Sequence, residues 1–300
     1  MLEGSEFLKK YPENSIGYLL FKGSNMLDVA NIEDPKGESR IFLGLLLNID
    51  NAEMYANLER TVDEFTIRKY MTWVKKRCTH YPLQYIVGYT FFYDYDFNCR
   101  EKVLIPRFDT EHMVSLALEM GPDRDCRILD MCTGTGCVGI SVYLERLRDG
   151  YQDDVTLTDI SDDALLLATE NAAHLDAEVR VLKSDLFEAF TDEEGNATEK
   201  FDIFLCNPPY IRSAEINFLM KDVREYEPRL ALDGDRDGLR FYKEIIPKLK
   251  NYLTENGIVI FEIGSNQYED VAKLLRGAGF REIHKYTDFS QLDRTVTAIV

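Results

Sequence analysis

Acidic residues end three successive strand-like runs of this sequence, and small residues follow the first of them. Asp130 closes an apolar run and precedes Met131-Cys132-Thr133-Gly134-Thr135-Gly136, after which an apolar helical segment begins. Small residues at such a turn let the backbone bend sharply and approach a ligand closely, and the following helix offers unpaired N–H groups. Asp159 ends the second run, near the offset of ~20 residues at which an acid accepts hydrogen bonds from a ribose. Asp185 ends the third run. We predict a nucleoside site formed by Asp130, Cys132, Thr133, Gly134, Thr135, Gly136, Asp159 and Asp185.

The expected charge of this nucleoside follows from Asp130. A dinucleotide with a pyrophosphate favours a full G-x-G-x-x-G turn with no acid before the loop. Asp130 stands directly before the turn and would instead attract a cationic amino acid group. S-adenosylmethionine carries an ammonium and a sulfonium, so we predict it as the cofactor, with S-adenosylhomocysteine as the product.

A fourth strand-like run ends in Asn207-Pro208-Pro209-Tyr210. Two consecutive prolines fix φ and remove two N–H donors, which leaves the Asn207 and Pro208 carbonyls able to face a substrate. A planar amide or exocyclic amine offers two donors, which the Asn207 side-chain oxygen and the Pro208 carbonyl can accept while Tyr210 stacks on its face. We predict that Asn207, Pro208, Pro209 and Tyr210 bind the substrate. Asn207, Pro208 and Tyr210 are the predicted catalytic residues, and Asn207 is also expected beside the cofactor.

The elements that position these residues alternate between strand-like runs and amphipathic helices. This alternation predicts an α/β fold with a mainly parallel sheet and helices on both faces. Ligands of such sheets lie outside the carboxyl ends of the strands, where the strand order reverses. The seven predicted strands are Arg127–Cys132, Val155–Asp159, Glu178–Lys183, Phe201–Cys206, Gly257–Glu262, Arg281–Tyr286 and Val296–Val300.

The first part of the chain has a different pattern. Apolar residues recur at helical spacing from Pro35 to about Cys78, which predicts a small helical bundle, and the opening stretch is expected to be helical too. An aromatic and β-branched run from Tyr85 to Tyr93, continued from Tyr95 to Cys99, predicts a β-hairpin. Three hundred residues suit two domains. The predicted boundaries are 1–82 for the helical domain, 83–103 for the hairpin connector and 104–300 for the α/β domain.

The charge distribution bears on the substrate class. The formal net charge is −18, yet the first 82 residues hold 11 basic and 12 acidic side chains, so the acidity is concentrated in the remainder. An acidic surface repels phosphate backbones, whose neutralisation by Lys and Arg supplies most non-specific nucleic-acid affinity. We therefore expect a protein substrate and no direct nucleic-acid partner.

The six cysteines form no C-x-x-C pair and have no His at metal-ligand spacing, so neither a zinc site nor a disulfide framework is indicated and no metal is expected. Cys132 and Cys206 end the first and fourth predicted strands. The longest apolar run is far shorter than the ~18–20 residues of a membrane span, and the N-terminus carries acids where a signal peptide is basic. We expect a cytoplasmic protein without a membrane partner.

These motifs together resemble a known family. Asp130-x-x-Thr133-Gly134-Thr135-Gly136 with Asn207-Pro208-Pro209-Tyr210 resembles the class I methyltransferases that modify planar NH₂ groups. The chain resembles more closely the protein-(glutamine-N5) methyltransferases that act on peptide-chain release factors, over about residues 35–300. Cys132 stands where that family usually has Gly, and Phe108 replaces a common proline. The supporting segments are Pro82-Leu83-x-Tyr85-Ile86-x-Gly88, Leu104-Ile105-Pro106-Arg107-x-Asp109-Thr110-Glu111, Val223-Arg224-x-Tyr226-Glu227-Pro228 and Asp237-Gly238-Leu239.

The resemblance implies a Rossmann-like methyltransferase domain that methylates the N5 atom of the glutamine in the Gly-Gly-Gln loop of a release factor. It implies that the helical domain docks the release factor. It also implies that the first and fourth strands, which end in Cys132 and Cys206, are neighbours beside the cofactor. It further implies that residues 132–136 line the cofactor, Asp159 takes the ribose, Asp185 and Leu186 sit at the adenine, and residues 207–210 bind the glutamine.

Three alternatives stay open. A ribosomal protein could be the glutamine-bearing substrate in place of a release factor. An adenine-N6 DNA methyltransferase also carries an Asn-Pro-Pro-Tyr segment, although the acidity of the catalytic part opposes it. A non-catalytic module that senses S-adenosylmethionine would keep the nucleoside residues without need of the intact Asn207-Pro208-Pro209-Tyr210 segment.

Overall fold

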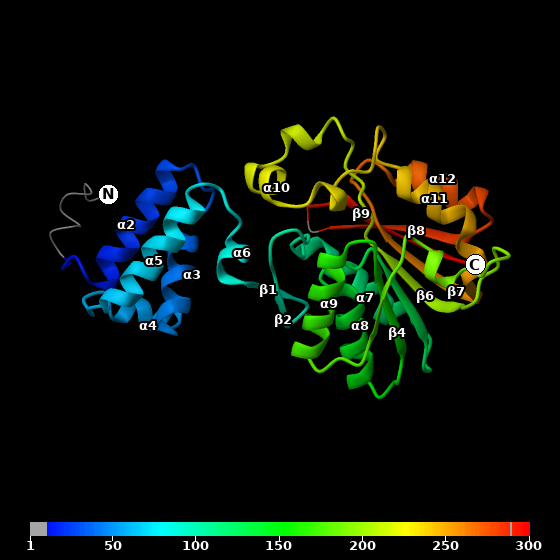
Figure 1. The fold of residues 1–300 in the computed structure, drawn as a ribbon, viewed down its shortest axis with the longest axis horizontal. Helices are drawn as coiled ribbons and strands as arrows, with labels where there is room; N and C mark the ends of the chain where they lie inside the picture. The colour runs from blue at the N-terminus through cyan, green and yellow to red at the C-terminus, as the bar shows by residue number, and fades with distance from the viewer. Residues whose placement is uncertain (1–10, 289) are drawn as a thin grey trace. The chain divides into compact units, whose positions relative to one another are not determined.

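The computed structural model describes residues 11–288 and 290–300, and the chain divides into two compact units, Met1–Gly88 and Tyr89–Val300 (Figure 1). The first ten residues, for which a helix was expected, lie outside the described residues. The described part of the first unit is helical, as predicted. Its helices are α2 (Ile16–Val29), α3 (Pro35–Leu47), α4 (Asn51–Ala56), α5 (Glu64–Arg77) and α6 (Leu83–Val87).

Side-chain caps define where the N-terminal helices begin. The side chains of Ser15, Asp34 and Asp63 accept hydrogen bonds from backbone N–H groups in the first turns of α2, α3 and α5. Such caps satisfy donors that a helix start leaves unpaired. The three long helices bury a common core around Phe42 and Tyr70, and the Tyr70 hydroxyl donates to the Leu19 carbonyl at 3.0 Å.

The predicted hairpin is present but shorter than expected. Strands β1 (Tyr89–Phe92) and β2 (Tyr95–Asn98) pair antiparallel, whereas Tyr85 to Val87 belong to helix α6 and form no strand. The prediction was wrong there because Pro82 begins a helical turn and Gly88, at φ +94°, ends it in the left-handed region that glycine adopts freely. The chain therefore becomes extended only after Gly88.

The second unit contains one seven-stranded sheet in the order β5-β4-β3-β6-β7-β9-β8. All neighbouring pairs from β5 to β7 are parallel, and β9 runs antiparallel to both β7 and β8. This confirms the predicted mainly parallel sheet. The chain turns to opposite sides from β3 and β6, so the carboxyl ends of these two strands form the switch point of the topology. The strands are β3 (Arg127–Met131), β4 (Asp154–Asp159), β5 (Arg180–Lys183), β6 (Phe201–Cys206), β7 (Leu253–Glu262), β8 (Arg281–Thr287) and β9 (Asp293–Ile299).

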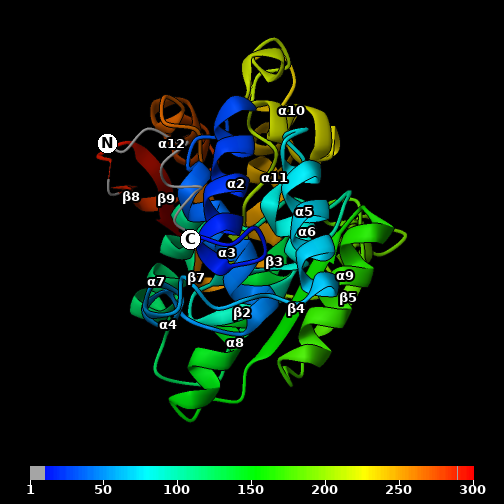
Figure 2. The same cartoon turned by 90° about the vertical axis from the view of Figure 1, so that its left-hand side faces the viewer.

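Helices cover both faces of the sheet. One face packs against α7 (Glu111–Met120), α8 (Cys137–Arg148) and α9 (Asp162–His174), and α9 lies along β4 and β5 (Figure 2). The other face packs against α11 (Arg240–Leu249) and α12 (Tyr268–Gly277). Every residue of the central strand β6 is buried. A strand covered on both sides reads as a continuous apolar run, which explains why β6 was found with its bounds from sequence.

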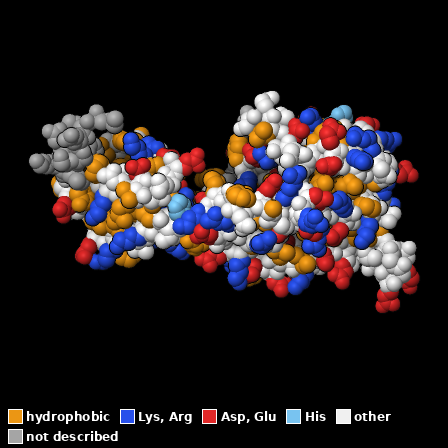
Figure 3. All heavy atoms as spheres, turned by 90° about the horizontal axis from the view of Figure 1, so that it is seen from above, with side chains coloured by type: hydrophobic (Ala, Val, Ile, Leu, Met, Phe, Trp, Pro, Cys, Tyr) orange, Lys and Arg blue, Asp and Glu red, His pale blue; other side chains and the backbone are white. Residues whose placement is uncertain are grey.

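The surface carries charges of both signs. On the face seen in Figure 3, Lys and Arg side chains lie interspersed with Asp and Glu. Among the residues that the structure describes, none of the helices is both long enough and apolar enough to cross a bilayer.

Candidate active site

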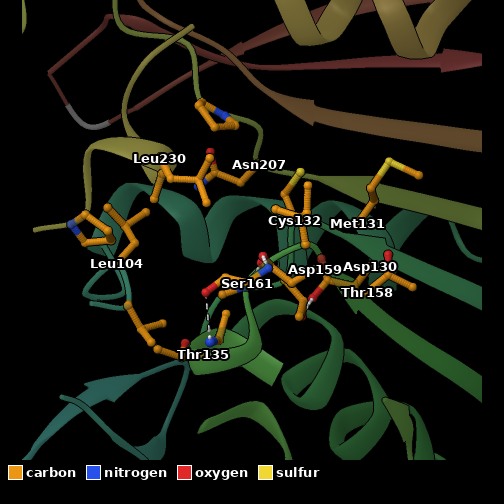
Figure 4. Close-up of a pocket in the computed structure, with 18 of the residues that line it drawn as sticks. Leu104, Asp130, Met131, Cys132, Thr135, Thr158, Asp159, Ser161, Asn207 and Leu230 are labelled. Carbon is orange, nitrogen blue, oxygen red and sulfur yellow. Dashed lines mark hydrogen bonds between the residues drawn. The ribbon is translucent and has the colours of Figure 1, made fainter. Parts of the chain in front are cut away.

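A cavity opens at the carboxyl ends of β3, β4 and β6, where the topology reverses (Figure 4). In Figure 4, Asp159 and Ser161 lie across the cavity from Asn207 and Leu230. Most of the residues predicted for the cofactor and substrate therefore meet around one space. Those that line the cavity are Asp130, Cys132, Thr133, Gly134, Thr135, Asp159, Asp185, Leu186, Asn207 and Pro209. Gly136, Pro208 and Tyr210 are not among the residues that line it.

Gly136 serves the turn into α8. Its φ is +82°, and a Cβ there would lie 2.7 Å from Cδ1 of Ile140. Only glycine meets both conditions without strain. Cys132 also has a positive φ, +60°, although it carries a side chain, and it is half-buried in the cavity wall. Left-handed backbone at a non-glycine residue is uncommon and concentrates at functional loops.

Asp130 is a buried carboxyl group with polar but neutral partners. Its Oδ2 accepts hydrogen bonds from the Thr133 hydroxyl at 2.6 Å and from the Gly139 N–H at 3.0 Å. Burial raises the pKa of Asp130 to about 7, against the effect of these hydrogen bonds. Among the described residues no Lys or Arg is paired with it, so a cation that enters the cavity would be the charge that favours its ionised form.

Asp159 ends β4 and joins the loop after β3 to the loop after β4. Its Oδ2 accepts from the Gly134 N–H at 3.0 Å and its Oδ1 accepts from the Ser161 N–H at 2.9 Å. Each oxygen keeps lone pairs for a further donor. Burial raises the pKa of Asp159, while the backbone hydrogen bonds lower it. A half-buried carboxylate fixed in this way can accept from two neighbouring hydroxyls.

The loop after β5 supplies a third part of the wall. Asp185 is exposed at the cavity edge, and Leu186 adopts a positive φ of +52°. The buried Ser184 holds this turn, because its hydroxyl donates to the Leu186 carbonyl at 2.7 Å and accepts from the Ala189 N–H at 3.0 Å. Leu186 thus offers an apolar surface to the cavity.

The segment after β6 divides into two parts. Asn207 and Pro209 line the cavity, and Nδ2 of Asn207 donates to Oγ1 of Thr110 at 3.4 Å. The Tyr210 hydroxyl instead donates to Oε1 of Glu262 at 3.0 Å, and the Tyr210 carbonyl accepts from Nε2 of Gln267 at 2.9 Å. The structure therefore shows Tyr210 anchored to the end of β7, and its predicted stacking on a substrate stays a prediction.

Sequence reasoning missed Glu262 and the role of Thr110. Glu262 is buried at the end of β7, and its Oε2 accepts from the Thr110 hydroxyl at 2.6 Å. Burial raises the pKa of Glu262, while hydrogen bonds from Thr110 and Tyr210 lower it. One signal was available. Glu262 is an acid at the end of a predicted strand, as Asp130, Asp159 and Asp185 are.

Two segments distant in the chain form another wall. Arg107 pairs with Glu227 at 2.5 Å, and the Ile105 N–H donates to the same carboxylate at 3.2 Å. Leu104 and Leu230 beside them line the cavity. Burial raises the pKa of Glu227, and the Arg107 guanidinium opposes that shift.

Within residues 11–288 and 290–300, no group of three or more His, Cys, Asp or Glu side chains could hold a metal ion.

Comparison with known proteins extends over both units. Residues 19–88 match the PrmC N-terminal domain family, and residues 110–235 match the methyltransferase small domain family. A release factor glutamine methyltransferase of Clostridium acetobutylicum is 36% identical over 93% of this chain and 96% of its own length. This chain belongs to the release factor glutamine methyltransferase family.

Further members of the release factor glutamine methyltransferase family are similarly related. Those of Geobacter sulfurreducens and Bacillus cereus are each 33% identical, over 96% and 92% of this chain and 95% of their own lengths. A solved ribosomal protein L11 methylase of Lactobacillus delbrueckii subsp. bulgaricus aligns with 66% of this chain and 80% of its own, at 22% identity and a TM-score of 0.45. So distant a likeness has no bearing on substrate.

Proposed function

We infer that this protein transfers a methyl group from S-adenosylmethionine to the side-chain amide nitrogen of a glutamine in a peptide-chain release factor. The observation that carries this inference is that relatives named for that activity match both units over nearly the whole chain. Translation terminates in the cytoplasm, so a release-factor substrate would place the enzyme there.

The charged and apolar side chains of the cavity lining suit the cofactor. Asp159 offers two carboxylate oxygens to the ribose hydroxyls, and the ammonium of the methionine part would supply the cation that Asp130 lacks. Leu186 supplies an apolar surface for the adenine. Residues 132–136 would pass close to the methionine part. When bound, S-adenosylmethionine supplies an electrophilic methyl group on a sulfonium.

Asn207 would hold the glutamine amide beside that methyl group. It lies in the wall of the same cavity as Asp130 and Asp159. Its side-chain oxygen would accept one N–H of the glutamine, and the carbonyl of Pro208 would accept the other. Proline at 208 and 209 removes competing backbone donors from this turn. Tyr210 and Pro209 would support the substrate from the same segment.

The chemical task is displacement by a weak nucleophile. The nitrogen of an amide shares its lone pair with the carbonyl, so orientation and electrostatic positioning must supply most of the rate. The new N–C bond would form as the S–C bond breaks, and the electron pair of that bond would stay on the sulfur of the leaving S-adenosylhomocysteine. One proton of the methylated nitrogen would pass to water. Hydrogen bonds from the amide to Asn207 and Pro208 would favour charge that develops on its nitrogen during the transfer.

The helical unit is proposed to dock the release factor. Its match to the PrmC N-terminal domain family covers residues 19–88, and none of the cofactor residues lies in that range. A separate unit suits recognition of a folded protein.

The test is direct methylation. Purified protein is incubated with isotopically labelled S-adenosylmethionine and a release factor, and the modified residue is located by mass mapping. We expect one methyl group on the glutamine of the Gly-Gly-Gln loop and none on a release factor whose glutamine is replaced by alanine. Label on another residue, or none, would contradict the proposed function. Parallel incubations with ribosomal protein and with duplex DNA test the two alternative substrates.

A further inference from the structure

A buried chain of hydrogen bonds leads from the end of β7 to Asn207. The Thr110 hydroxyl donates to Oε2 of Glu262 at 2.6 Å, and Nδ2 of Asn207 donates to the oxygen of that hydroxyl at 3.4 Å. Glu262 is 2% exposed and Thr110 is 3% exposed, so water does not compete for the bond between them, and Asn207 is half-buried in the cavity wall. The three residues come from β7, the turn before α7 and the end of β6.

The chemistry of each group determines which atom donates and which accepts in these two hydrogen bonds. An ionised carboxylate has no proton, so the Thr110 hydroxyl must donate to Glu262. A hydroxyl has only one proton, so toward Asn207 the Thr110 oxygen can only accept. The group that Asn207 turns to Thr110 is therefore its NH₂, and its oxygen Oδ1 is the atom left for the cavity.

Other contacts orient Glu262 and oppose the effect of burial, which raises its pKa. The Tyr210 hydroxyl donates to Oε1 at 3.0 Å, so both carboxylate oxygens accept from a buried or half-buried hydroxyl. Arg294 contributes a positive charge close by and is itself held by Asp109 at 3.3 Å. Hydrogen bonds and a nearby cation favour a carboxylate over a carboxylic acid, in opposition to burial.

We propose that Glu262 and Thr110 are positioning residues that set the polarity of the Asn207 amide and thereby select glutamine over glutamate. With Oδ1 toward the cavity, Asn207 accepts from the NH₂ of a glutamine. A glutamate carboxylate at the same place would present an oxygen to that oxygen and leave both unpaired. Sites built to hydrogen-bond one group reject analogues that lack it. This proposal rests on the proposed function, because it assumes a glutamine substrate.

Three substitutions separate the polarity of the Asn207 amide from side-chain packing. Thr110→Val removes the hydroxyl at nearly constant shape, and Thr110→Ser retains it. Glu262→Gln is isosteric, but its NH₂ can donate to the Thr110 oxygen, which frees the Thr110 proton for Oδ1 of Asn207 and turns the Asn207 NH₂ to the cavity. Asp153→Asn is the matched control. Asp153 is a buried carboxylate paired with Arg146 at 2.5 Å, outside the cavity lining.

The experiment measures kcat on the release factor and the Kd of S-adenosylmethionine. It also measures the Kd ratio, defined as the Kd of a release factor with glutamate in place of its glutamine divided by the Kd of the intact release factor. For Thr110→Val and Glu262→Gln we expect kcat to fall about 10–100-fold, as for other residues that orient a reactive group, with the cofactor Kd within about twofold. The Kd ratio should fall at least about tenfold in Glu262→Gln, since a donor then faces the glutamate. Thr110→Ser should recover most of the kcat.

The outcomes separate the two claims. If the wild-type protein leaves the release factor unmethylated, both the proposed function and this selectivity fail. If it methylates the release factor while Thr110→Val keeps full kcat, the positioning role alone is contradicted. An unchanged Kd ratio in Glu262→Gln also overturns it, as does a Thr110→Ser variant as impaired as Thr110→Val. The Asp153→Asn control should lower the melting temperature without altering the Kd ratio.

Discussion

The backbone N–H of Gly134 donates a 3.0 Å hydrogen bond to Oδ2 of Asp159, so the loop after β3 is fastened to the acid that ends β4. One carboxylate thus shapes the glycine-containing loop and offers acceptors to the cavity. Removal of this side chain should disturb the cofactor site in two ways.

Asp159→Ala should weaken binding of S-adenosylmethionine by roughly 1.5–3 kcal/mol, because it deletes a charged acceptor for two hydroxyls. Isothermal titration calorimetry on the whole protein measures the change. The matched control is Glu178→Ala, which removes an exposed acid before β5 and should leave the Kd unchanged. An unchanged Kd in Asp159→Ala would mean that β4 does not end at the ribose.

Asn207→Ala should reduce kcat by ~10²–10³, the typical cost of losing an oriented catalytic hydrogen-bonding group. The cofactor Kd should stay within about twofold, because the lost oxygen serves the substrate amide. Single-turnover methylation of the release factor gives the rate, and Asn196→Ala in the exposed loop after β5 is the control. Undiminished methylation by Asn207→Ala would remove this residue from the substrate site.

Cofactor affinity should depend on pH through Asp130. Its pKa is raised to about 7 by burial, so the folded apo protein holds this proton more tightly than the unfolded chain does. Binding of a cation requires the ionised form, so affinity should rise with pH through 7, by about tenfold between pH 6 and pH 8. Calorimetry across that range should show a flatter profile for Asp130→Asn. An identical pH dependence of affinity in the two proteins would mean that the cationic group of the cofactor does not bind at Asp130.

The same pKa shift sets the sign of an effect on folding. Because the folded-state pKa of Asp130 lies above its ordinary value of 3.8, its contribution to stability is complete below about pH 4 and is lost as the pH rises through 7. Asp130→Asn should remove the part of the pH-dependent loss of stability that comes from this carboxyl group. Chemical unfolding of the apo protein at pH 5 and pH 8 measures it, and an equal decrease in both proteins would contradict the assignment.

Thiol reagents should inactivate the apo enzyme, and bound S-adenosylmethionine should protect it. Cys132 is half-buried in the cavity wall, and the strands ended by Met131 and Cys206 are paired neighbours, as expected from sequence. Bulk attached to Cys132 would intrude on the methionine part of the site. Cys132→Gly should stay active and resist the reagent, and it also relieves the positive φ at this position. Equal inactivation with and without cofactor would contradict the prediction that Cys132 lies beside the bound cofactor.

The helical unit should be needed for methylation of the release factor and not for binding of the cofactor. A shortened chain of residues 81–300 keeps every residue that lines the cavity. We expect it to bind S-adenosylmethionine with a Kd near that of the full chain and to methylate the intact release factor far more slowly. Methylation at the full rate by a folded short chain would show that docking lies in the α/β unit.

Local pattern was sufficient to find the strand ends. Asp130, Asp159 and Asn207 lie at the ends of apolar runs, and parallel strands of one sheet bring their carboxyl ends to one edge. The sequence alone therefore predicted that they lie together, and all three line one cavity. The hairpin prediction failed at Tyr85 to Val87, because β-branched and aromatic residues there were outweighed by Pro82 and Gly88, which begin and end a helical turn.

Only the tertiary structure decided which side chains are partners across the chain. Thr110 and Glu262 are 152 positions apart, and Ile105 and Glu227 are 122 apart, yet each pair is joined by a buried hydrogen bond. No periodicity encodes such a pair, because it depends on strand order and on how a loop folds back over the sheet. The residue types at the strand ends could therefore be read from the sequence, whereas the polarity of Asn207 required the structure around it.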